Sequence, residues 1–152
     1  FISMSAVLAA VSKVSSFNIL GIFGLLIWIN GFLFESIGDY QLTRFIKDPK
    51  NAGRIMTSGL WRYTRHPNYF GEVTQWWGLF LIVCTLPNGL LAVISPLTIT
   101  FLILKVSGIP MLEKAYDTNK EFQEYKKVTN AFFRGFPSYQ NNYKKVLTSF
   151  LY

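Results

Sequence analysis

The sequence predicts an all-α integral membrane protein: a bundle of at least three transmembrane helices followed by a C-terminal amphipathic helix on the cytosolic side. Three observations predict this fold class. The 152-residue chain is 51% hydrophobic and only 15% charged, whereas soluble domains carry about 25% charged residues. Its apolar residues form long uncharged stretches, and its basic residues gather in two segments. We expect residues 1–152 to form a single helical membrane domain.

The uncharged stretches have nearly the length that is needed to cross a hydrocarbon layer about 30 Å thick. The first covers residues 17–34 without a charge, and the second, residues 69–86, carries Glu72 as its one charged residue. The third, residues 88–104, is again uncharged. These stretches predict three spans, over about residues 17–35, 68–86 and 88–106.

The basic residues predict the orientation in the membrane. Eight of the fifteen Lys and Arg lie from Lys105 to the C-terminus, and six lie between the first two spans: Arg44, Lys47, Lys50, Arg54, Arg62 and Arg65. The connection over residues 85–89 has none. Because basic loops stay on the cytosolic side, we expect the long loop and the C-terminal segment to be cytosolic. This distribution explains the net charge of +7 without a nucleic-acid partner.

Prolines and polar residues predict where the helices begin and end. We expect the first helix to continue beyond the membrane until Asp48 and Pro49 end it. Pro67 suits the first turn of the second span, where its missing amide has no intrahelical partner. Pro96 predicts a kink in the third span. Residues 111–133 mix charged and apolar side chains at helical intervals, which predicts one amphipathic helix at the interface or on the cytosolic ends of the spans.

Two further features limit the possible chemistry. The chain begins at Phe1, and residues 2–14 resemble the end of another apolar segment, so we expect this to be the C-terminal part of a longer protein. A single Cys84 and a single His66 give no set of metal ligands, so no metal site is predicted. The chain has no glycine-rich dinucleotide fingerprint and no P-loop.

The helix that starts at Pro67 contains the most informative polar residues. Because they are separated by four, three and one residues, four side chains share one face: Asn68, Glu72, Gln75 and Trp76. A carboxylate about one turn below the membrane surface costs a few kcal/mol, so Glu72 is a functional candidate that should face the bundle interior. The alternative is that Glu72 only pairs with Arg65 or Arg62.

Other charged residues near the predicted cytosolic surface have two interpretations each. Glu35 and Asp39 form an acidic pair at a helix end that disfavours negative charge. They either pair with the basic loop or line a cofactor pocket. Arg62 and Arg65 are the best-placed residues for dinucleotide phosphates. His66, which precedes a proline, is more often a hydrogen-bonding residue at a helix start than a catalytic acid.

One segment resembles a known family. Residues 59–72 (GLWRYTRHPNYFGE), followed by Trp76, Trp77 and Gly78, closely resemble the C-terminal domain of the steroid 5-alpha-reductase-like membrane proteins. The similarity covers about residues 35–137 and continues on both sides of this motif, with Asp39-Tyr40-Gln41-Leu42, Phe45 and Asp48-Pro49 before it and residues 107–114, Tyr125 and residues 131–133 after it.

The resemblance implies a helical membrane domain that holds its cofactor on the cytosolic side. The wider superfamily contains sterol reductases that use NADPH and isoprenylcysteine carboxyl methyltransferases that use S-adenosylmethionine. Both have an Arg-His-Pro turn, but Glu72 after Gly71 favours the reductases. The resemblance implies that eight residues bind the cofactor: Glu35, Asp39, Arg62, Arg65, His66, Asn68, Tyr69 and Glu72.

The expected function is therefore an NADPH-dependent reductase that acts on the double bond of a lipophilic enone of steroid, isoprenoid or fatty type. In the family, groups that polarise the substrate come largely from N-terminal helices that precede the matched segment, so the catalytic residues stay open. Two alternatives also stay open: an S-adenosylmethionine-dependent membrane methyltransferase, and a non-catalytic accessory subunit of a membrane complex. The expected partners are membrane lipid, a lipophilic small molecule and other membrane subunits, with no nucleic acid.

Overall fold

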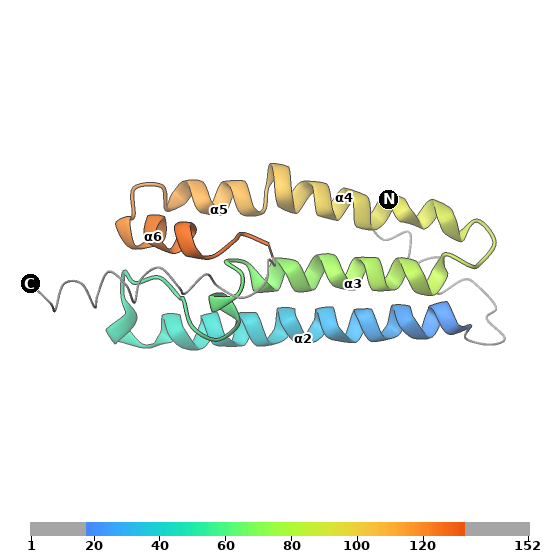
Figure 1. Cartoon of the computed structure of the whole chain (residues 1–152), viewed down its shortest axis with the longest axis horizontal. Helices are drawn as coiled ribbons and strands as arrows, with labels where there is room; N and C mark the ends of the chain where they lie inside the picture. Colours follow the sequence, from blue (N-terminus) through green and yellow to red (C-terminus); the bar gives the residue numbers. More distant parts are fainter. Residues whose placement is uncertain (1–17, 133–152) are drawn as a thin grey trace, which may run out of the picture.

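The structure is a computed structural model that describes residues 18–132, and these residues form helices joined by turns (Figure 1). The α-helices are α2 (Ile19–Lys47), α3 (Pro67–Val83), α4 (Ile94–Phe101), α5 (Ile109–Ala115) and α6 (Lys120–Val128). Short 3-10 helices are η1 (Pro49–Asn51), η2 (Gly59–Arg62) and η3 (Gly89–Val93), and η4 (Leu102–Val106) is a π-helix. The predicted all-α class is thus confirmed for the described residues.

Helix α2 begins and ends where its polar residues predict. The Asn18 side chain accepts a hydrogen bond from the amide of Gly21 at 2.8 Å and caps the first turn. The helix then runs for 29 residues to Lys47, which corresponds to about 44 Å. Asp48 ends it and accepts from the amide of Lys50 at 3.0 Å, with Pro49 between them. The predicted helix end at Asp48 and Pro49 is confirmed.

Helices α2 and α3 lie side by side along their length and meet at glycines (Figure 1). Gly24 faces Gly78, and Gly31 faces Gly71, so glycines seven residues apart on each helix form the seam. A Cβ atom on Gly71 would lie 2.5 Å from the backbone nitrogen of Glu35. The absence of side chains here lets the two backbones approach closely, which is the usual way in which membrane helices associate.

The segment from η3 to α5 covers the other side of α3, so α3 lies in the middle of three layers (Figure 1). Val73 of α3 packs with Ile103 and Ile109 in a buried apolar cluster. Trp77 of α3 donates from its indole nitrogen to the Thr100 hydroxyl at 3.3 Å. These contacts place the N-terminal end of α3 beside α5, where the charged residues lie.

Two helical segments are long and apolar enough to cross a membrane: Ile19–Lys47 and the nearly continuous Gly89–Ala115. Only 17% and 28% of their most apolar windows are buried, whereas the core helix of a soluble protein would be covered. Large apolar side chains such as Ile19, Leu90 and Phe101 are 75%, 70% and 59% exposed. This apolar surface is suited to lipid and indicates membrane association.

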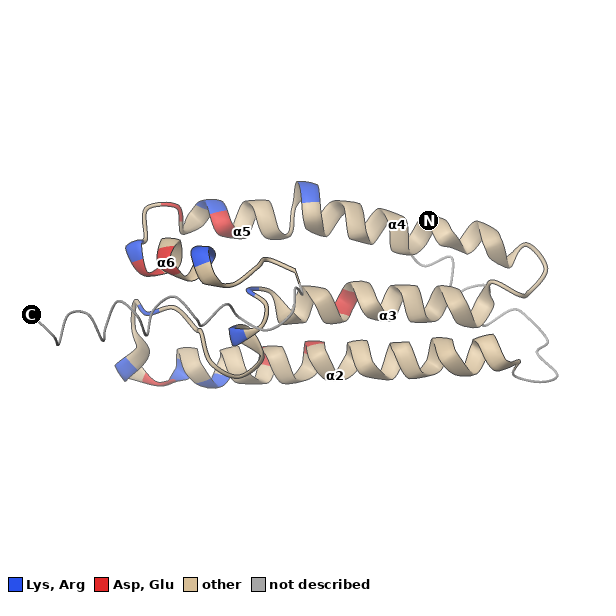
Figure 2. Cartoon of the chain, viewed as in Figure 1, with Lys and Arg blue, Asp and Glu red and all other residues tan. Residues whose placement is uncertain are grey.

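Charge is separated along the bundle (Figure 2). Figure 2 shows Lys and Arg in the half of the bundle that holds η1, η2, α5 and α6. Glu35 of α2 and Glu72 of α3 are also charged, whereas residues 18–34 and 73–104 carry no charge. Helix α3, with 17 residues, lies between the two long segments.

Pro96, the site of the predicted kink, lies in the first turn of α4. Pro96 is the third residue of α4, after the 3-10 helix η3, and it is fully buried. The change from the 3-10 helix to the α-helix falls two residues before Pro96, between Val93 and Ile94. The irregular turn lies further on, at η4, where the Ser107 amide donates to the Leu102 carbonyl at 2.9 Å.

The single amphipathic helix predicted over residues 111–133 is instead two helices. Helix α5 ends at Ala115, and α6 begins at Lys120. The residues between them favour turns, and the Asn119 side chain accepts from the amide of Phe122 at 3.0 Å, which caps α6. The break lets α6 fold back on η2 (Figure 1); the segment after Phe132 lies outside the described residues.

Candidate cofactor site

The site is built on η2, which is fastened to α2. Gly59 has a φ of +62°, and a Cβ atom there would collide with the Gln41 side chain. Gln41 accepts from the amide of Leu60 at 2.9 Å, and Trp61 donates from its indole nitrogen to the Gly38 carbonyl at 3.1 Å. A glycine is required at position 59 because other residues rarely adopt this conformation. The anchored loop places the following turn over the end of α2.

The turn from Thr64 to His66 is buried and held by Glu113 of α5. Arg65, 8% exposed, approaches Glu113 Oε1 with Nε and Nη2 at 2.8 Å each. His66 Nε2 lies 3.1 Å from the same oxygen, and Lys126 Nζ lies 3.1 Å from Oε2. One buried carboxylate therefore joins the start of α3 to α5 and α6.

The chain around α6 covers this turn. The Arg65 amide donates to the Asn130 carbonyl at 2.9 Å, and the Arg65 guanidinium donates to the Thr129 carbonyl. The Thr64 hydroxyl donates to the Ala131 carbonyl at 2.9 Å. Tyr125 donates from its hydroxyl to the Trp61 carbonyl. Helix α6 is thus fixed to the Arg-His-Pro turn mainly by backbone carbonyls.

Burial sets the protonation of two side chains here. Burial lowers the pKa of His66 below its usual value, and the neighbouring Glu113 carboxylate opposes that shift only in part. Burial also raises the pKa of the Tyr125 hydroxyl. At neutral pH, His66 is therefore a neutral imidazole and Tyr125 a hydrogen-bond donor.

A cavity of about 190 Å³, the inner cavity, lies between η2, α5, α6 and the ends of α2 and α3. Its polar lining comes from Arg54, Arg65, His66, Asn68, Glu113 and the hydroxyls of Tyr116 and Tyr125. Trp61, Phe45 and Phe122 contribute aromatic rings. Asn68 Oδ1 is buried and has no hydrogen-bond partner within the described part of the chain. Since a buried acceptor without a donor costs about 1–3 kcal/mol, the inner cavity suits a ligand that brings an N–H group.

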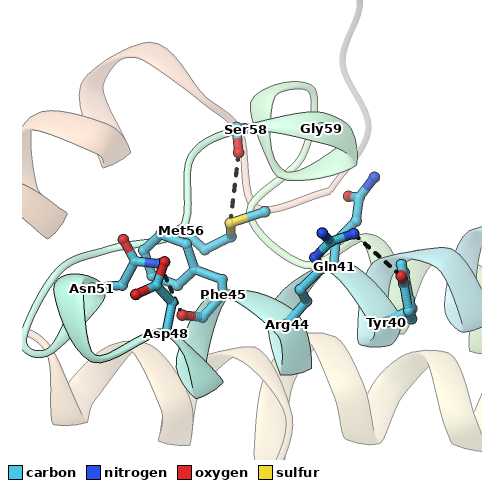
Figure 3. Close-up of a pocket in the computed structure, with 9 residues that line it drawn as sticks. All are labelled: Tyr40, Gln41, Arg44, Phe45, Asp48, Asn51, Met56, Ser58 and Gly59. Atoms are coloured by element: carbon cyan, nitrogen blue, oxygen red, sulfur yellow. Dashed lines mark hydrogen bonds between the residues drawn. The ribbon is translucent and has the colours of Figure 1, made fainter.

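A second cavity of about 420 Å³, the outer cavity, opens on the surface beside the inner one (Figure 3). Tyr40, Gln41 and Arg44 of α2 line it together with polar residues of the loop: Asp48, Asn51, Ser58 and Gly59. Phe45 and Met56 line both cavities and so lie between them. The outer cavity carries one cationic side chain, Arg44, and one anionic side chain, Asp48.

The structure brings together three of the eight predicted cofactor residues. Arg65, His66 and Asn68 line the inner cavity. The backbone nitrogen of Asn68 would be 3.3 Å from a Cβ atom on Gly38, so the start of α3 lies against α2. The Gln75 side chain donates to the Glu35 carboxylate of α2. The predicted polar face of α3 toward α2 is thus confirmed for Gln75.

The other five predicted residues lie elsewhere around the start of α3. Glu35 and half-buried Glu72 lie at the α2–α3 interface with exposed Asp39 near them. The Tyr69 ring stacks on His66 with centroids 5.6 Å apart, and Arg62 is exposed on η2. None of these five lines the inner or the outer cavity. Arg65 pairs with Glu113 and not with Glu72.

Sequence reasoning did not single out Glu113, Tyr125 and Trp61 as site residues. Glu113 lies on α5, three residues after Pro110 in a helix that begins at Ile109, so a carboxylate faces inward one turn after a proline start. A similar signal is present at Pro67 and Glu72. In the Lys-rich segment after Lys105, however, a glutamate resembles an ordinary exposed charge, so the sequence does not distinguish Glu113. Tyr125 and Trp61 join the site only through the fold of α6 and η2.

Comparison with known proteins gives one match. Neither a search of curated proteins nor a search of solved structures found a similar protein. The model of the family described as "Protein of unknown function (DUF1295)" matches residues 1–129. Since this match covers most of the chain, the protein belongs to that family.

Proposed function

We propose that the protein is a membrane-embedded, NADPH-dependent reductase that acts on the double bond of a lipophilic enone. The observation that carries the proposal is Asn68, a residue that lines the inner cavity and whose buried Oδ1 has no donor within residues 18–132. A nicotinamide carboxamide offers the missing N–H donor and a flat ring. The similarity of residues 59–72 to the steroid 5-alpha-reductase-like proteins supports the same assignment.

The residues of the two cavities fit the parts of a dinucleotide. The inner cavity, at about 190 Å³, is smaller than the roughly 300–1,000 Å³ of pockets that hold a whole ligand. It therefore suits the nicotinamide end, with Asn68 as acceptor and Trp61 among the aromatic walls. Arg44 of the outer cavity and Arg54 of the inner one supply positive charge for the phosphates.

NADPH, when bound, supplies a hydride. The chain's own residues then have three tasks. Asn68 orients the carboxamide, the buried cluster around Glu113 keeps the Arg-His-Pro turn and α6 in place, and the aromatic rings exclude water. The groups that polarise the substrate carbonyl are proposed to come from helices that precede residues 35–137, the segment that resembles the steroid 5-alpha-reductase-like proteins.

The proposal includes a topology. We infer that α3 is a third span, so that the basic loop and the segment after α4 lie together in the cytosol and residues 84–88 lie on the opposite side. The basic residues of the loop and of α5 and α6 support this orientation. NADPH would then reach the outer cavity from the cytosol.

Calorimetric titration of the protein in detergent or nanodiscs tests the proposal, with NADPH and S-adenosylmethionine in separate experiments. We expect saturable heat with NADPH below millimolar concentration and none with S-adenosylmethionine. Binding of S-adenosylmethionine alone would favour the methyltransferase alternative, because the Arg-His-Pro turn is common to both groups. Binding of neither compound would favour an accessory subunit.

A further inference from the structure

Arg44 is a cationic side chain of the outer cavity that forms no ion pair within residues 18–132. It lies in the last turn of α2. The ion pairs of lysine and arginine in that range run to Glu113 and Glu124. Arg44 donates one hydrogen bond there, from Nη1 to the Tyr40 hydroxyl at 3.4 Å (Figure 3). A guanidinium has five N–H donors, so Arg44 keeps donors for a ligand in the cavity.

The acidic residue of the same cavity, Asp48, serves the adjoining turn. Its Oδ1 accepts a hydrogen bond from the amide of Lys50 at 3.0 Å and caps η1. Figure 3 shows the Phe45 side chain between Asp48 and Arg44. The outer cavity therefore has a cationic end at Arg44 and a separate acidic end at η1.

The two cavities suit different parts of a dinucleotide. Arg54 lines the inner cavity, which holds the nicotinamide in the proposed function. The pyrophosphate follows the nicotinamide riboside, so we assign Arg54 to it. The outer cavity, at about 420 Å³, lies in the range of roughly 300–1,000 Å³ that is usual for ligand pockets. The rings of Tyr40 and Phe45 also line it, so it suits the adenosine end.

We propose that Arg44 binds the 2′-phosphate of the adenosine ribose and thereby makes the protein select NADPH over NADH. This inference rests on the proposed function, because it needs a nicotinamide dinucleotide in the two cavities. NADPH and NADH differ only in the 2′-phosphate. A guanidinium can form two parallel hydrogen bonds with a phosphate, and an arginine accommodates this same phosphate in other dinucleotide-binding proteins.

Calorimetric titration of the full chain in nanodiscs, with NADPH and NADH in separate experiments, tests the role of Arg44. Arg44→Leu should weaken NADPH binding roughly 10- to 100-fold, as expected for the loss of hydrogen bonds to a charged group. Its affinity for NADH should stay unchanged, which also shows that the variant is folded. The matched control is Lys47→Leu in the same helical turn, which is exposed and lines neither cavity. It should keep the preference for NADPH.

Asp48→Asn tests the charge of the cavity in the opposite direction. Asparagine caps a helix as well as aspartate does, so the turn at η1 is kept while the negative charge is removed. NADPH binding should become roughly 2- to 5-fold tighter, the scale of one charge interaction across several ångströms of water, and NADH binding should change less.

The outcomes separate this inference from the proposed function. If the unaltered protein binds NADH as tightly as NADPH, or if Arg44→Leu weakens both equally or neither, the role of Arg44 is overturned and the reductase proposal still stands. If the unaltered protein binds neither dinucleotide, the proposed function is overturned and this inference with it.

Discussion

At the scale of single residues, the candidate site depends on one carboxylate. Glu113 is 8% exposed and contacts Arg65, His66 and Lys126. A charge of this kind is tolerated in a buried position only with opposite charges and hydrogen bonds around it. The three partners come from the start of α3 and from α6. The Glu113 carboxylate therefore holds these two segments together and fixes one wall of the inner cavity.

Replacement of Glu113 by glutamine should therefore destabilise the protein strongly. The change keeps the shape of the side chain but leaves the buried Arg65 without an opposite charge, which costs about 3–5 kcal/mol in comparable pairs. Thermal or denaturant unfolding in detergent measures the loss.

The matched control is Glu124→Gln on α6. Glu124 pairs with Lys127 at 2.5 Å, but both side chains are exposed, at 72% and 66%, so the change should cost at most about 1 kcal/mol. Equal effects of the two substitutions would mean that the Glu113 cluster does not stabilise the fold.

His66 makes stability depend on pH in the mildly acidic range. Its pKa is lowered by burial in the folded protein, so below about pH 6.5 the unfolded chain takes up a proton that the folded protein refuses. Stability should then fall as the pH is lowered, by at most about 1.4 kcal/mol per pH unit from this residue.

Unfolding midpoints at pH 7.5 and 5.5 measure this effect. In His66→Gln, we expect a smaller difference between the two midpoints than in the unaltered protein. The same difference in both proteins would show that other groups cause the pH dependence, such as Glu113, which faces His66.

At the scale of elements, the bundle depends on the close approach of α2 and α3. Their glycines leave backbone against backbone over about two turns, with Gly31 against Gly71 near the site and Gly24 against Gly78 further away. This seam positions Asn68 beside Gly38 of α2 and thereby sets one wall of the inner cavity. The small residues act through geometry, since lipid gives the two helices no hydrophobic reason to associate.

Gly71→Ala should separate the two helices and cost about 1–3 kcal/mol of stability. The added methyl would lie 2.5 Å from backbone atoms of Gly31 and Glu35, which cannot move aside alone. Gly38→Ala is the milder comparison, because its nearest atom is Pro67 Cγ at 3.1 Å. Unfolding of both variants in detergent shows which substitution lowers the stability more. A larger loss in Gly38→Ala would contradict the account of the seam.

At the scale of the whole molecule, periodicity and prolines predicted the helical class and several boundaries. The cap at Asp48 and Pro49 and the start at Pro67 are local signals, because they act on the backbone within one turn. The same reasoning was incorrect over residues 111–133. There the outcome depended on an asparagine cap at Asn119, which begins a second helix, and not on apolar spacing.

The candidate site was harder to predict from the sequence than the fold. Asn68 was identified because it lies one residue after a helix-starting proline on the polar face of α3. Glu113 was not, because its three partners, Arg65, His66 and Lys126, come together only after α5 and α6 fold back on the Arg-His-Pro turn. Pairings across about 48 residues leave no periodic signal in the chain.

The proposed topology predicts the accessibility of single cysteines in sealed vesicles. In a Cys84→Ser background, Lys50→Cys should react with an impermeant maleimide only from the cytosolic side, and Asn88→Cys only from the other side. The reason is that basic loops are retained in the cytosol. Labelling of both positions from one side would exclude α3 as a span.

The most direct test of the central claim, that Asn68 lines the cofactor site, is the affinity for NADPH of Asn68→Leu against the control Thr74→Val. Thr74 lies on the same helix, and its hydroxyl donates a hydrogen bond to the carbonyl of Phe70 in that helix at 2.7 Å. Loss of a buried hydrogen bond to ligand should weaken binding about 10-fold in Asn68→Leu and leave Thr74→Val unchanged. Equal affinity in all three proteins, or no NADPH binding by the unaltered one, would contradict the account.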